Sequence, residues 1–122
     1  MAYLQMGAAE ARFADLVWEN EPVASGELSR IAEEKLGWKK TTSFTVLKRL
    51  CDKGFFRNDK SMVTSLISRE EYYSRRSESL VENAYNGSLP AFVAAFTAKK
   101  GLKQEDLDEI RRMLDEYEKN NK

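Results

Sequence analysis

Apolar positions recur at helical spacing in the first third of the chain. The first run predicts a helix over residues 8–19 that ends before Pro22. The second predicts a helix that begins after an N-cap at Ser25 and ends at a left-handed glycine, Gly37. The inward faces of these two helices comprise Phe13, Leu16, Val17, Leu28, Ile31, Ala32 and Leu36.

A third amphipathic helix follows after only a few residues. Thr41 or Thr42 can cap its start, and Gly54 closes its end. Its inward face comprises Phe44, Leu47 and Leu50. Two short helices joined by a tight glycine-containing turn, with an earlier helix to complete the core, predict a helix-turn-helix.

The periodicity changes after Gly54. A turn-prone stretch over residues 58–61 separates Phe55 and Phe56 from residues 62–67, which are β-branched and apolar without helical spacing. We therefore predict two short strands joined by a basic turn. The predicted fold class is mainly α, with a winged helix-turn-helix and a small two-stranded β wing over residues 8–67, followed by a C-terminal helical dimerisation region over residues 68–122.

The C-terminal region is predicted to hold three helices. Ser68-Arg69-Glu70-Glu71 is a capping box, in which the serine accepts from the third backbone N–H and the glutamate reaches back, and the helix runs to about residue 86. Ser88 caps the next helix, which has a proline in its first turn. The last helix covers about residues 104–117.

The apolar stripes of these helices have little to pack on, because a region of about 50 residues seldom buries enough surface to be stable alone. A second copy of the chain would cover the stripes around a two-fold axis. The predicted dimer interface comprises Leu80, Ala84, Leu89, Phe92, Val93, Phe96, Leu107, Ile110 and Leu114.

The residue inventory argues against an enzyme. Cys51 is the single cysteine and the chain has no histidine, which excludes an intrachain disulfide, a histidine-based triad and the usual zinc clusters. Adjacent acids such as Glu33 and Glu34 point apart on a helix, and no glycine-rich phosphate loop links a strand to a helix. We predict no catalytic residue, no metal and no cofactor.

The remaining composition fits a folded protein of the cytoplasm. Charged residues make up 33% and hydrophobic residues 42% of the chain, which suits a folded rather than a disordered protein. The longest apolar run, residues 91–96, is far shorter than the roughly 20 residues of a membrane span. We therefore expect a cytoplasmic location.

Basic residues are concentrated in one segment, although the formal net charge is zero. Residues 38–60 hold seven bases and two acids, whereas residues 1–37 hold three bases and seven acids. Such asymmetry orients a protein on phosphate, although a basic cluster alone is often a solvated face.

The start of the third helix carries side chains suited to DNA. That end of a recognition helix enters the major groove, where short hydroxyl side chains approach base edges or thymine methyl groups and bases approach phosphates. The threonines can also serve as helix caps, and the wing turn can be merely solvated. The candidate DNA-binding residues are Lys39, Lys40, Thr41, Thr42, Ser43, Thr45, Lys48, Arg49, Arg57 and Lys60.

Several of these segments resemble the BlaI/MecI/CopY, or penicillinase-repressor, family. The similar segments are Trp18-Glu19, Trp38 to Leu50, Lys53-Gly54, Ser68 to Tyr72 and Gly87-Ser88-Leu89, within a resemblance from about Glu10 to Tyr117. The resemblance implies an N-terminal winged helix, a C-terminal dimerisation region and repression through a palindromic operator. It also implies that Thr41, Thr42, Ser43 and Thr45 face the groove and that Arg49 lies near the DNA backbone.

The resemblance bears on induction as well. In the β-lactam-responsive members a membrane sensor-protease system leads to cleavage of an Asn-Phe bond, and this chain has Ala95 in place of the asparagine while Phe96 remains. The copper-responsive members carry a cysteine-rich C-terminal metal site, and the tail of this chain has no cysteine. The resemblance therefore leaves a sensor-protease partner open and argues against copper sensing.

Two other functions stay open at this point. One is a winged-helix module that binds proteins rather than DNA, with the basic segment as ordinary surface. The other is a dimeric repressor released by a small molecule, bound near Trp38 or Phe92, rather than by proteolysis.

Overall fold

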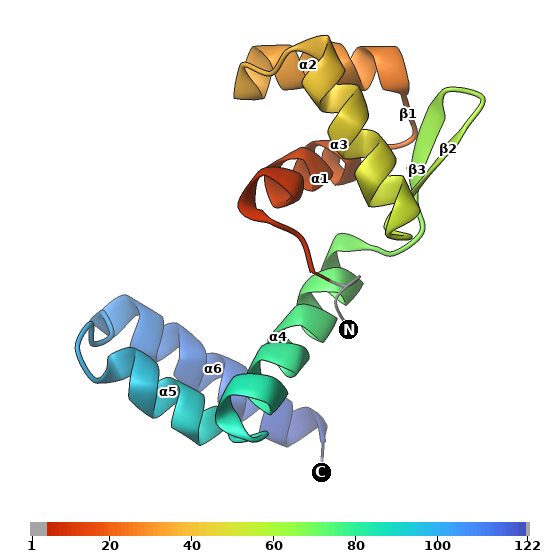
Figure 1. The fold of residues 1–122 in the computed structure, drawn as a ribbon. Helices are drawn as coiled ribbons and strands as arrows, with labels where there is room; N and C mark the ends of the chain where they lie inside the picture. Colours follow the sequence, from red (N-terminus) through yellow and green to blue (C-terminus); the bar gives the residue numbers. More distant parts are fainter. Residues whose placement is uncertain (1–4, 122) are drawn as a thin grey trace. The chain divides into compact units, whose positions relative to one another are not determined.

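The computed structural model describes residues 5–121, which form a mainly helical structure with one small sheet (Figure 1). The helices are α1 (Ala8–Asn20), α2 (Ser25–Leu36), α3 (Lys40–Asp52), α4 (Arg69–Tyr85), α5 (Leu89–Thr97) and α6 (Gln104–Asn120). The strands are β1 (Val23–Ala24), β2 (Phe56–Asp59) and β3 (Met62–Ser65). The predicted fold class, a mainly α protein with a winged helix-turn-helix, is confirmed. The chain divides into two compact units, one that ends at Ser79 and one that begins at Leu80.

The core of the first unit lies between α1, α2, α3 and the sheet. Most of the predicted inward residues are buried there, namely Phe13, Leu16, Val17, Leu28, Ala32, Leu47 and Leu50. Ile31, Leu36 and Phe44 are partly buried and pack against the same cluster. The helical periodicity thus predicted the core correctly, because each short helix buries one apolar stripe.

The sheet has one strand more than predicted. β3 is central and pairs antiparallel with β2 on one side and with β1 on the other. In β1, Val23 lies opposite Val63 and is buried. A strand of two residues is too short to show alternating polarity, so the sequence pattern could not predict it.

Two predicted helix caps are wrong. The N-cap of α2 is Ala24, and Ser25 is the buried first residue of the helix, whose backbone N–H donates to the carbonyl of Ser61 at 2.8 Å. The N-cap of α3 is Lys39, so Thr41 and Thr42 lie inside the first turn rather than before it. The predicted helix end at Gly37 is confirmed, since this residue has the left-handed φ of 70°.

Trp18 joins α1 to the segment that leads into α4. Its indole Nε1–H donates to the carbonyl of Ile67 at 3.0 Å, and its ring lies 5.4 Å from the ring of Phe56 and 5.9 Å from that of Tyr72. Beside it, Arg69 pairs with Asp15 on α1 at 3.1 Å. These contacts fix the first turn of α4 on the winged-helix core.

The second unit exposes its apolar side chains. Ser88 caps α5 as predicted, and its hydroxyl accepts a hydrogen bond from the Ala91 N–H at 3.1 Å. Neither α5 nor α6 contains a buried residue. Within residues 5–121, no helix combines the length and the hydropathy needed to cross a bilayer.

Candidate nucleic-acid interface

The first turn of α3 presents basic and hydroxyl side chains to solvent. Lys39, Lys40, Thr41 and Thr42 are all exposed. The N–H of Ser43 donates to the Lys39 carbonyl at 3.1 Å, so the backbone N–H groups of the three residues between them precede the regular helical hydrogen bonds. Such free N–H groups at a helix N-terminus can bind phosphate oxygens.

The charges at this end of α3 oppose the helix dipole. A helix N-terminus favours acidic side chains, and α1, α2, α4 and α6 each carry at least one acid in the first turn. In α3 the first turn holds no acid and begins with Lys39 and Lys40. This arrangement is unfavourable for the isolated helix and becomes favourable when an anion lies against its N-terminus.

The exposed face of α3 continues through Thr45, Lys48 and Arg49. The hydroxyl of Thr45 donates to the Thr41 carbonyl at 2.8 Å. Lys48 lies 3.2 Å from Asp52, and the two side chains are 78% and 66% exposed, so this ion pair is weak and can be exchanged for a phosphate. The face therefore offers both basic groups and short side chains along two turns.

A shallow hollow of about 380 Å³ lies on this face. Its lining residues are Thr41, Thr42, Thr45, Val46 and Arg49. The hollow thus brings together four of the predicted DNA-binding residues. Val46 was not predicted; it is apolar and only 6% exposed, and its residue type gives no signal of DNA contact.

Ser43 does not belong to this face, which corrects its prediction as a residue that approaches DNA. The side chain is 2% exposed, and its Oγ is a buried polar atom without a hydrogen-bond partner among the described residues. The helical repeat explains the burial, since Val46, Leu47 and Leu50 follow Ser43 by three, four and seven residues and are also buried. The polar side chain of serine indicated a DNA-facing position, whereas its helical spacing indicates a buried one.

Replacing Ser43 with alanine should raise the free energy of unfolding by about 1 kcal/mol, because it removes a buried hydroxyl without a partner and adds the better helix former. Urea denaturation of both proteins measures the difference. The variant should retain the full DNA affinity of the parent. A loss of sequence preference in S43A would restore Ser43 to the DNA-contacting set.

The wing turn presents two further basic residues, Arg57 on β2 and Lys60 at the tip, and both are exposed. Asp59 pairs with Met62, and the two residues between them, Lys60 and Ser61, have φ values of 51° and 67°. Two consecutive left-handed residues define a type I′ turn, which normally holds asparagine and glycine. The wing therefore places a lysine at a backbone position that lysine adopts at some cost.

The predicted dimer residues all lie on exposed or half-buried positions. Leu89 is 57% exposed, Phe96 51% and Leu114 60%. The others are Leu80, Ala84, Val93 and Ile110, which are exposed, and Phe92 and Leu107, which are half-buried. Leu102, Met113 and Tyr117 are further large apolar side chains of the second unit that are exposed.

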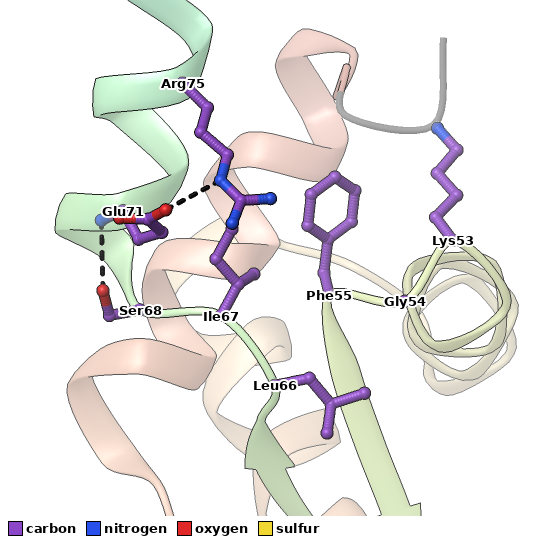
Figure 2. A pocket seen from close by; sticks show the side chains of 8 residues that line it. All are labelled: Lys53, Gly54, Phe55, Leu66, Ile67, Ser68, Glu71 and Arg75. Atoms are coloured by element: carbon purple, nitrogen blue, oxygen red, sulfur yellow. Dashed lines mark hydrogen bonds and ion pairs between the residues drawn. The ribbon is translucent and has the colours of Figure 1, made fainter. Parts of the chain in front are cut away.

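A larger hollow of about 520 Å³ lies in the first unit, beside the start of α4 (Figure 2). The Ser68 hydroxyl there accepts from the Glu71 N–H at 3.0 Å, and the Glu71 carboxylate accepts from Arg75 at 2.7 Å. The serine half of the predicted capping box is thus confirmed, whereas the glutamate side chain pairs with Arg75. These polar groups already partner one another, so we assign no ligand to this hollow.

Lys53 links the end of α3 to the start of α1. Its Nζ lies 2.9 Å from the Oε1 of the buried Glu10. Burial opposes ionisation of Glu10, but hydrogen bonds from the Gly7 N–H and Lys53 outweigh it and hold the pKa of this carboxyl below its ordinary value. This lysine is therefore committed to the fold and is not available to DNA.

Neither the cysteine nor the acids form a reactive or metal-binding site in the described residues. Cys51 is half-buried, and burial together with the nearby Asp52 raises the pKa of its thiol, which disfavours the reactive thiolate. Across residues 5–121, no group of three or more His, Cys, Asp or Glu side chains is arranged to hold a metal ion.

Comparison with known proteins agrees with this geometry. The chain is 25% identical over 122 residues to a penicillinase repressor from Bacillus licheniformis, which covers 97% of this chain and 95% of the relative. It is 23% identical over 114 residues to the methicillin resistance regulatory protein MecI from Staphylococcus aureus, and 22% identical to MecI from Mammaliicoccus sciuri; each match covers 90% of this chain and 93% of the relative.

The model of one protein family, described as penicillinase repressor, matches residues 6–116. This range includes α1 to α5, the sheet and most of α6. The proteins of this family are transcriptional repressors and not enzymes, which confirms the prediction that the chain is not an enzyme. The chain therefore belongs to the penicillinase repressor family.

Proposed function

We propose that this protein is a transcriptional repressor that binds operator DNA as a homodimer, with α3 in the major groove. The observation that carries the proposal is the first turn of α3, where Lys39 and Lys40 occupy the positive end of the helix dipole and no acid offsets them. A phosphate backbone is the partner that makes such a helix end favourable. Relatives named as a penicillinase repressor and as a methicillin resistance regulatory protein support the same function.

In this proposal, residues 8–67 form the DNA-binding domain and residues 68–122 form the dimerisation region. Support comes from the second unit, in which six large apolar side chains of the predicted interface are at least 41% exposed. They are Leu80, Leu89, Val93, Phe96, Ile110 and Leu114. A two-fold dimer would present two α3 helices to a palindromic operator with half-sites about 10 bp apart, or a multiple of that distance.

The proposed setting is the cytoplasm, where a DNA-binding repressor has access to promoters. The resemblance to the β-lactam-responsive members of the family supports a membrane sensor-protease system as a regulatory partner. The bond that such a system would attack lies between Ala95 and Phe96, both exposed on α5. Incubation of the purified protein with the sensor encoded nearest its gene tests this partner: cleavage between Ala95 and Phe96 would support it, and a chain that stays intact would exclude it.

Fluorescence anisotropy with duplex DNA from the protein's own promoter tests the repressor function. We expect two protomers to bind each site with nanomolar affinity and a clear preference over a scrambled duplex. If the dimer neutralises about 6 to 10 phosphates, affinity should fall by roughly 10³ to 10⁵ between 50 and 200 mM salt. Weak binding without preference for any promoter would instead favour a protein-interaction module.

Two substitutions on α3 should separate phosphate contacts from base contacts. K40Q should weaken binding to promoter and scrambled DNA about equally and reduce the salt dependence, because Lys40 suits phosphate. T42A should weaken promoter binding most. Lys35 is an exposed lysine in the last turn of α2, outside the basic segment, and supplies the matched control K35Q. This variant should bind promoter and scrambled DNA as the wild type does. Equal losses on both duplexes for T42A would contradict base readout by this residue.

A further inference from the structure

Thr45 is the one threonine of the exposed α3 face whose hydroxyl hydrogen the structure shows engaged within the helix. Its Oγ1 donates to the Thr41 carbonyl one turn earlier, at 2.8 Å. Donation to an acceptor on a base edge would require breaking this bond. The side chain is nevertheless exposed, so the groups that it keeps available toward a ligand are its γ-methyl and the acceptor lone pairs of Oγ1.

The surroundings of Thr45 suit an apolar contact. Thr45 and Val46 line the same hollow, and Val46 is 6% exposed in total. In the major groove, the one apolar group on a base edge is the 5-methyl of thymine, and threonine methyl groups are among its ordinary partners. The engaged hydrogen removes donation to a base, and the apolar neighbour Val46 favours contact with the thymine methyl over acceptance by Oγ1.

We propose that Thr45 reads a thymine in each half-site through its γ-methyl group and not through its hydroxyl. This assignment rests on the proposed DNA-binding function and deepens it, because it names the chemical group on the DNA. Arg49, on the rim of the same hollow, remains available to the backbone or to a neighbouring base. The recognition of one base pair then depends on a methyl–methyl contact.

The test begins with a duplex chosen by the protein itself. Rounds of selection from a random-sequence library with the full-length chain yield the preferred operator. Each thymine of that operator is then replaced in turn, symmetrically in both half-sites, by deoxyuridine, which lacks only the 5-methyl group. Wild-type protein should lose about fourfold in affinity per half-site, or roughly fifteenfold per dimer, at one symmetric position and little at the others, as expected for burial of one methyl group.

Two variants of Thr45 identify the side-chain group. T45V keeps the γ-methyl and removes the hydroxyl, and it should bind the thymine duplex within twofold of wild type and remain sensitive to deoxyuridine. T45S removes the methyl and keeps the hydroxyl with its hydrogen bond to the helix. Its affinity for the thymine duplex should be about fifteenfold below that of wild type, and replacing thymine with deoxyuridine should lower it no further. Thr97 on α5, whose hydroxyl donates to the Val93 carbonyl at 2.8 Å, supplies the matched control T97S, which should bind as wild type.

The outcomes separate this inference from the function on which it rests. If selection yields no preferred duplex for wild type, the repressor function itself fails. If a preferred duplex is found but T45V loses affinity while T45S retains it, the hydroxyl reads the base and the inference is overturned. Insensitivity of the wild type to every deoxyuridine substitution overturns it as well, as does a loss in T97S equal to that in T45S.

Discussion

F96E is expected to convert the proposed dimer into a monomer and to weaken operator binding by about 10² to 10⁴, because two separate monomers would then bind the two half-sites. Phe96 is 51% exposed on α5 and lies at helical spacing from Leu89, Phe92 and Val93. A carboxylate in the middle of this stripe would have to be buried without a partner in a two-fold interface. Analytical ultracentrifugation measures the mass, and anisotropy with the promoter duplex measures the affinity.

A matched control exists on the same helix. Ala94 is exposed and lies on the opposite side of α5 by helical spacing, so A94E introduces the same charge away from the stripe. It should remain dimeric and bind the operator as wild type does. Circular dichroism should show helical content unchanged in both variants. A dimeric F96E with full affinity would place the interface elsewhere on the molecule.

F13A is expected to lower the free energy of unfolding by about 3–5 kcal/mol, as large-to-small changes of buried aromatic residues do. Phe13 is 1% exposed at the centre of the first unit, and its ring stacks on Trp38 with centroids 5.5 Å apart and planes 3° from parallel. Because a domain of this size is stable by only about 5–15 kcal/mol, this loss is a large fraction of the total.

The position of Trp38 gives F13A a second consequence. Trp38 directly precedes Lys39, the N-cap of α3, so a cavity beneath its ring loosens the start of the recognition helix. Urea denaturation at a fixed protein concentration measures stability, and hydrogen exchange of the first α3 amides measures the local effect. R12A, at the exposed neighbouring position, should change stability by less than about 0.5 kcal/mol. Equal stability of F13A and R12A would contradict the central role of Phe13.

Helical periodicity and capping residues predicted most of the helices, because each helix is amphipathic and several begin or end at a residue suited to a cap. Gly37 ends α2 in the left-handed region at φ 70°, and Ser88 caps α5 with its hydroxyl. The basic segment and the apolar stripe of the second unit are likewise linear properties of the chain. These properties alone predict a DNA-facing helix and an apolar surface that needs a partner.

Other features depended on contacts between distant segments. Lys53 is one of the bases of the positive segment, yet its pairing with Glu10, 43 positions earlier, assigns it to the fold. β1 exists because Val23 pairs with Val63 across 40 positions of sequence, and no pattern within two residues can indicate that. Burial is decided by all the elements packed around a side chain, which residue type alone does not specify.

By itself, the sequence of this protein determined the mainly α class, the three helices of the winged helix-turn-helix, the wing and the concentration of basic residues in one segment. These features follow from periodicity, glycine conformation and charge, which are properties of neighbouring residues. Only the tertiary structure decided that Ser43 is buried in the core while Thr45 stays exposed. Two hydroxyl residues two positions apart on one helix differ in this way because a helix rotates by about 200° between them, so one faces the core and the other faces solvent.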